Sequence, residues 1–75
     1  MKDIEKRVEA KCEGTEKQFL LDSIRQEASY SAKGDKKSLE RVLKRVECMY
    51  DSLSFSGQKI ARELISKIKE DINSL

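Results

Sequence analysis

The sequence predicts an all-α fold, a small antiparallel bundle of four helices with a short first helix. Two apolar stripes in the second half of the chain repeat at the i, i+3, i+4, i+7 spacing of an amphipathic helix, and no segment alternates with the period of two typical of a strand. The first stripe comprises Leu39, Val42, Leu43, Val46, Met49, Tyr50 and Leu53. The second comprises Ile60, Ala61, Leu64, Ile65, Ile68, Ile72 and Leu75.

Length and composition predict a single helical domain over residues 1–75. The chain contains 37% apolar and 40% charged residues, with 16 basic against 14 acidic side chains. Because the charges are of mixed sign and the apolar residues are periodic, we expect a folded, well-solvated bundle instead of a disordered chain. Proline is absent, and glycine is scarce.

The first expected helix covers residues 2–13 and carries Ile4, Val8 and Cys12 on one side. Gly14 is suited to end it, because glycine readily adopts the left-handed conformation found after helices. The next residues, 15–18, have the form of a capping box that would open a second helix.

The second helix is expected to end near Lys33, before Gly34. An alternative is a three-helix fold in which residues 2–33 form one long first helix, since one internal glycine costs only about 1 kcal/mol. Phe19 and Tyr30 would then lie nearly opposite a second apolar face. That face comprises Leu20, Leu21, Ile24, Ala28 and Ala32. One small core cannot cover both faces, so the long helix implies a homodimer; the coincidence of glycine and capping box favours the break.

The third helix is expected to begin at an N-cap, Asp35 or Ser38, and to continue to about Ser52. The two apolar stripes then face each other across a hairpin. Leu43 and Leu64 lie near the middle of the stripes, and we therefore expect both to be deeply buried.

A turn over residues 53–57 separates the last two helices. Ser54 or Ser56 is expected to cap the fourth helix, which would run from about Gly57 to Asn73. Short connections favour antiparallel neighbours in a bundle.

The residue content argues against catalysis and cofactor binding. Histidine is absent, which removes Ser-His and Cys-His nucleophile systems, and the apolar stripes contain no inward-facing charge. Two cysteines without histidine are too few for a structural zinc site, so we predict no metal. Without a membrane span or secretory signal, the expected location is a reducing cytoplasm, where Cys12 and Cys48 would be free thiols.

A basic face on the third helix is the first candidate binding surface. Lys37, Arg41, Lys44 and Arg45 lie opposite the apolar stripe, and residues 33–45 hold six basic against two acidic side chains, a local charge of +4. Such a surface could meet nucleic-acid phosphates or an acidic protein, or could simply keep the bundle solvated. The face carries no aromatic residue of its own, unlike many nucleic-acid-binding surfaces.

Phe19 and Tyr30 form the second candidate surface, because aromatic side chains often anchor protein interfaces. They could alternatively belong to the core. Together these features predict a non-enzymatic helical binding module that regulates or inhibits a larger protein or complex, as small helical proteins of bacteria and phages often do. The alternative is a small nucleic-acid-binding protein that uses the basic face.

Overall fold

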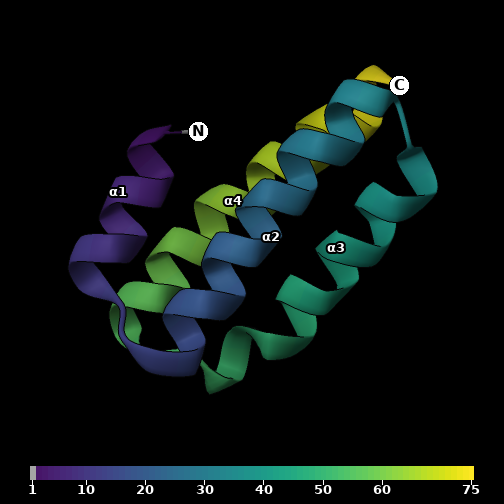
Figure 1. Ribbon diagram of the computed structural model, residues 1–75. Helices are drawn as coiled ribbons and strands as arrows, with labels where there is room; N and C mark the ends of the chain where they lie inside the picture. Colours follow the sequence, from purple (N-terminus) through teal and green to yellow (C-terminus); the bar gives the residue numbers. More distant parts are fainter. Residues whose placement is uncertain (1) are drawn as a thin grey trace.

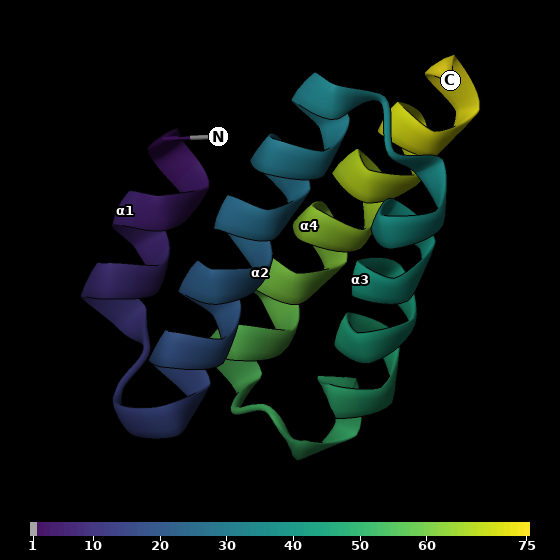
Figure 2. The ribbon, with the colours of Figure 1, turned by 45° about the vertical axis from the view of Figure 1, so that its right-hand side comes forward.

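The computed structural model describes residues 2–75 and is all-α within that range. Its helices are α1 (Lys2–Lys11), α2 (Gly14–Lys33), α3 (Lys36–Met49) and α4 (Phe55–Ser74), with a short 3-10 helix, η1 (Tyr50–Ser52), between the last two. Each helix leads back alongside the one before it, as two views show (Figures 1 and 2). The predicted four-helix bundle with a short first helix is confirmed. Among the described helices, none combines the length and hydropathy that crossing a membrane requires.

The chain breaks at Gly14, as the favoured prediction had it. Gly14 has φ +63°, a left-handed conformation that glycine adopts without steric cost. The predicted capping box is not formed: Glu13 is the N-cap of α2, and its side chain makes no capping hydrogen bond. Because α2 begins at Gly14, Thr15 lies inside the first turn instead of at the N-cap, and the Gln18 side chain donates to Asp22 Oδ1 at 2.9 Å.

Helix ends follow the predicted chemistry more closely elsewhere. Gly34 ends α2 with φ +69°, and its N–H donates to the Ser31 carbonyl while Asp35 N donates to the Tyr30 carbonyl. This pair of bonds is a Schellman motif. Of the two possible caps for α3, Asp35 is the one used, accepting from Ser38 N at 3.2 Å and from Ser38 Oγ at 2.7 Å.

Ser54 caps α4 by accepting a hydrogen bond from Gly57 N at 3.1 Å. The helix therefore begins at Phe55, two residues before the predicted start. The third helix is shorter than predicted, because residues 50–52 tighten into the 3-10 turn that leads to the connection.

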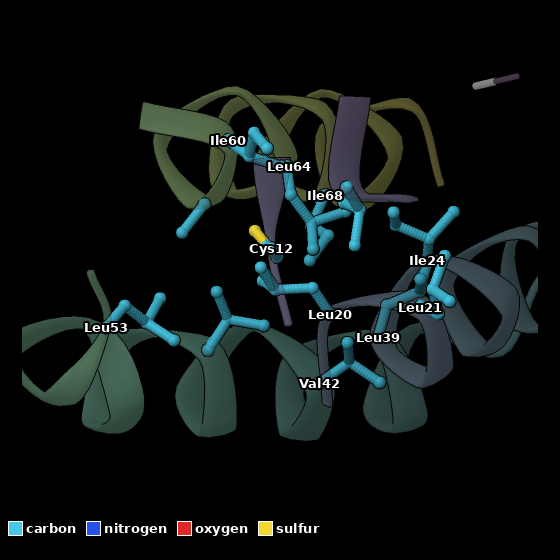
Figure 3. Packing of buried hydrophobic residues seen from close by; sticks show 13 residues of the cluster. Cys12, Leu20, Leu21, Ile24, Leu39, Val42, Leu53, Ile60, Leu64 and Ile68 are labelled. Atoms are coloured by element: carbon cyan, nitrogen blue, oxygen red, sulfur yellow. The ribbon is translucent and has the colours of Figure 1, made fainter. Parts of the chain in front are cut away.

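The core lies between α2, α3 and α4, with α1 packed against α2 and α4 (Figure 2). No contact joins α1 to α3 within the described part of the chain. Figure 3 shows Cys12 pointing into the cluster beside Leu20 and Leu64. The fully buried apolar side chains include Val8, Leu20, Ile24, Leu39, Val46, Leu64 and Ile68.

Several stripe positions are less buried than the spacing predicted. Met49 and Leu75 are 40% and 53% exposed, because they occupy the ends of their helices. Leu43 is partly buried, at the edge of the core instead of its middle. The remaining partly buried stripe residues are Tyr50, Ile65 and Ile72.

The buried face of α2 also differs from the expectation. Ala28 and Ala32 are exposed, whereas Ser23 and Glu27 are buried. The observed face follows Leu20 by three, four and seven residues, so Glu27 is carried into the interior by helical periodicity. The apolar face of residues 4, 8 and 12 is covered within one chain. The long-helix alternative needed a second copy of the chain to cover that face, and this need is absent in the observed fold.

Candidate functional site

An open groove between α2 and α3 contains a sizeable cavity. The cavity has a volume of about 650 Å³. Its lining residues are Phe19, Arg41, Lys44, Arg45, Cys48 and Met49. One helix thus supplies an aromatic ring, and the other supplies three cations, a thiol and a thioether.

A second cavity of about 180 Å³ lies on the same pair of helices and shares Arg41 and Arg45 with the first. Its lining residues are Gln26, Tyr30, Ser38, Arg41, Val42 and Arg45. We call the two cavities together the α2–α3 groove.

Helical periodicity explains which residues line the α2–α3 groove. On α2, Phe19, Gln26 and Tyr30 are spaced i, i+7, i+11 and therefore share one edge. On α3, Arg41 and Arg45 are one turn apart on the facing edge. The hairpin places Ser38 near Tyr30 beside the connection, and Met49 near Phe19 at the far end.

The α2–α3 groove unites the two surfaces that the sequence presented as separate. Five of the six predicted binding residues line it, and Lys37 does not. The basic face of α3 carries no aromatic residue of its own, but α2 brings Phe19 into the same cavity as Lys44. Phe19 and Tyr30 also pack against the core, so they are structural and surface residues at once.

Among the described residues, no carboxylate forms a salt bridge with Arg41, Lys44 or Arg45. The salt bridges among the described residues lie outside the groove and join Arg7 to Glu63 and Lys67 to Asp71. Arg45 Nη1 instead donates to Gln26 Oε1 at 3.3 Å across the groove. A neutral amide satisfies a guanidinium less strongly than a carboxylate does. Arg41, Lys44 and Arg45 therefore give the groove a positive charge with no salt bridge to a described carboxylate, although, besides the hydrogen bonds from Ser38, the charge of Arg41 helps to lower the pKa of Asp35.

The two cysteines are free thiols in contrasting surroundings. Cys48 is exposed in the groove. Cys12 is buried, and burial, with a smaller effect of the neighbouring Glu16 carboxylate, raises the pKa of its thiol to about 11. Cys12 thus stays protonated at neutral pH, whereas Cys48 is open to reagents and partners.

Phe55 is a surface feature that sequence reasoning missed. Its side chain is 75% exposed at the start of α4, with Lys59 Nζ 5.0 Å from the ring centroid. It borders a cavity of about 180 Å³ between α1 and α4, which Arg7 and Lys11 also line. The sequence feature that could have indicated this exposure is the position of Phe55, directly after the Ser54 cap and outside the second apolar stripe.

Glu27 is the other residue that the sequence did not single out. It is 2% exposed, and its Oε2 has no hydrogen-bond partner among residues 2–75.

No group of three potential metal ligands occurs in the same range. Comparisons of this chain with protein-family models, with curated proteins and with solved structures find no match.

Proposed function

We propose that this protein is a non-enzymatic helical binding module that regulates or inhibits a larger protein or complex by binding a segment of it in the α2–α3 groove. The observation that supports this most directly is the meeting of Phe19 and Met49 with three cations in one open cavity. Apolar anchors contribute affinity at protein interfaces, and surrounding charges contribute orientation and association rate.

The lining of the groove favours a protein segment over other ligands. Met49 is 40% exposed, and its unbranched thioether can adapt to different apolar surfaces. The stems of Arg41 and Lys44 can cover apolar side chains of a partner while their charged ends remain solvated. Phe19 is held against the core, so little conformational freedom is lost when a partner packs on it.

A nucleic-acid partner is the second candidate function, and one observation favours it. Phe19 lies in the same cavity as Arg41, Lys44 and Arg45, and binders of single-stranded nucleic acid combine aromatic rings with a cationic groove. The partial burial of Phe19 counts against this function, because base stacking needs an open ring face. A nucleic-acid partner would show affinity that falls by roughly 0.7 log units per log unit of salt for each phosphate contact.

Photo-crosslinking from Cys48 tests the proposed function. A benzophenone maleimide should label Cys48 selectively, because Cys12 is buried and protonated. The labelled protein is irradiated in a lysate of its source cells, with and without nuclease. We expect a protein adduct that survives nuclease.

Matched charge variants show whether the adduct depends on the groove. Arg41→Glu with Arg45→Glu should abolish it, whereas Lys36→Glu with Lys37→Glu, which makes the same charge change on the same helix outside the groove, should leave it intact. An adduct to nucleic acid would favour the second function. A protein adduct equally sensitive to both double variants would contradict binding in the groove.

A further inference from the structure

The arrangement of α1 shows how this fold receives a helix. α2, α3 and α4 contact one another pairwise, and α1 contacts α2 and α4 without touching α3. Val8 on α1 and Cys12, which directly follows the helix, are 0% and 3% exposed. A short helix with a narrow apolar stripe is therefore buried along one pair of helices (Figure 2).

The α2–α3 groove is a comparable position that is open. Its two cavities extend along α3 from Ser38 to Met49, which at about 1.5 Å per residue corresponds to roughly 16 Å. α1 has 10 residues, or about 15 Å by the same rise. An occupant of about three helical turns would match the length of the groove.

The charge of the α2–α3 groove specifies the chemistry of the occupant. Arg41 and Arg45 are one turn apart on α3, and both residues line both cavities. Neither forms a salt bridge with a described residue. Carboxylates one turn apart on a neighbouring helix could pair with the two guanidinium groups. Phe19 on α2 and Met49 on α3 line the same cavity and offer apolar surface for the stripe of that helix.

We infer that the segment bound in the α2–α3 groove is an acidic amphipathic helix of the partner protein, with a narrow apolar stripe and carboxylates at i and i+4 on the flank that faces α3. The inference rests on the proposed function, because it names the partner of the same groove. Binding adds a fifth helix, which lies against α2 and α3 as α1 lies against α2 and α4, and replaces the Arg45–Gln26 hydrogen bond with an ion pair.

Selection from a displayed library of random peptides of about 14 residues tests the inference, since that length accommodates a helix of about 16 Å and its ends. The full-length protein is the bait, and the Arg41→Glu, Arg45→Glu double variant removes peptides that bind elsewhere. We expect enriched peptides with apolar residues at helical spacing and paired carboxylates. Circular dichroism of the complex should show helix formation, and amide chemical shifts should change along α2 and α3.

Charge reversal supplies the matched control. Affinity for an enriched peptide should fall about tenfold or more in the double variant, because two opposite-charge contacts become repulsive. It should hold within about twofold when Lys36 and Lys37 are changed to glutamate, since exposed charges outside the groove contribute little. Exchanging the peptide's carboxylates for lysines should restore binding to the Arg41→Glu, Arg45→Glu variant.

The outcomes separate the inference from the proposed function. Groove-dependent peptides that are extended, proline-rich or basic would overturn the acidic helix and leave the protein-binding groove standing. A selection that yields no groove-dependent peptide would overturn both. Tighter binding of oligo-dT than of any selected peptide, with chemical-shift changes at Phe19 and Arg41, would also overturn both.

Discussion

Glu16 in α2 accepts two hydrogen bonds from Ser54, one from the backbone amide at 2.5 Å and one from the hydroxyl at 2.7 Å. Ser54 Oγ in turn accepts from Gly57 N at 3.1 Å and so caps α4. A carboxylate near a helix N-terminus also interacts favourably with the helix dipole. One side chain of α2 therefore fixes the start of α4, 38 residues further along the chain.

Replacing Glu16 by alanine should lower the free energy of unfolding by about 1–2 kcal/mol, because two hydrogen bonds to a charged group are lost at a partly exposed site. Glu13→Ala is the matched control, since Glu13 is exposed and its side chain makes no capping bond. Its effect should stay within about 0.5 kcal/mol. Urea denaturation of both variants checks the difference, and equal effects would mean that the Glu16–Ser54 contact contributes nothing.

Stability should decrease in acid partly through Glu16. Burial by itself would raise the pKa of Glu16, but hydrogen bonds from Ser54 and Cys12 outweigh it and lower the pKa below the usual value. The folded state then binds this proton less readily than the unfolded state. The stabilisation is complete above the unfolded-state pKa and is lost as the pH falls through the lowered folded-state pKa.

The measurement is the free energy of unfolding between about pH 6 and pH 3, where carboxylates titrate. It should fall less steeply in Glu16→Gln than in the parent protein. The other carboxylates with lowered pKa values, Glu63 beside Arg7 and Asp35 beside Ser38, should preserve part of the slope in the variant. Superimposable pH profiles for variant and parent would contradict the assignment to Glu16.

Gly57 should respond to substitution in a way that depends on Glu16. A Cβ atom at Gly57 would meet the Glu16 carboxylate at 2.8 Å, so Gly57→Ala must displace that side chain. In a Glu16→Ala background the clash is absent, and alanine should stabilise α4 by up to about 1 kcal/mol through helix propensity. A double-mutant cycle measures the coupling, and a stabilisation of equal size in both backgrounds would disprove it.

Leu64 and Leu43 should differ in their sensitivity, although the sequence predicted both to be deeply buried. Leu64 is 0% exposed, whereas Leu43 is partly buried beside the core. Leu64→Ala should cost about 3–5 kcal/mol because it leaves a cavity, and Leu43→Ala about 1–2 kcal/mol. Thermal or urea denaturation compares them, and a larger loss for Leu43 would place the centre of the hairpin elsewhere.

Local chemistry made much of the fold predictable. The break at Gly14 and the caps at Asp35 and Ser54 depend on residues within a few positions of each other, so sequence spacing suffices to find them. The capping box after Gly14 failed because α2 begins at Gly14, which places Thr15 inside the first turn instead of at the N-cap, and Gln18 donates to Asp22 instead. The contact of Glu16 with Ser54 joins residues 38 positions apart and has no local sequence signal.

The groove could be predicted only in parts. Helical spacing identifies its cations and its aromatic residues as separate candidates, but it does not predict their juxtaposition. The rotation of α2 about its axis, which buries Glu27 and turns Phe19 toward α3, depends on the simultaneous packing of α1, α3 and α4 against it. That rotation exposes Ala28, which helical spacing alone assigned to the apolar face.

The two thiols should react at very different rates. Cys48 is exposed, whereas Cys12 is 3% exposed with a pKa raised to about 11 by burial and by Glu16. With a disulfide reagent at about pH 8, one equivalent should react rapidly and the second only through opening of the fold, because the thiolate is the reactive form. Glu16→Ala should accelerate the slow phase by lowering the stability of the α2–α4 contact, and Cys48→Ser should abolish the fast phase. Two equally fast phases in the parent protein would show that α1 does not shield Cys12 in solution.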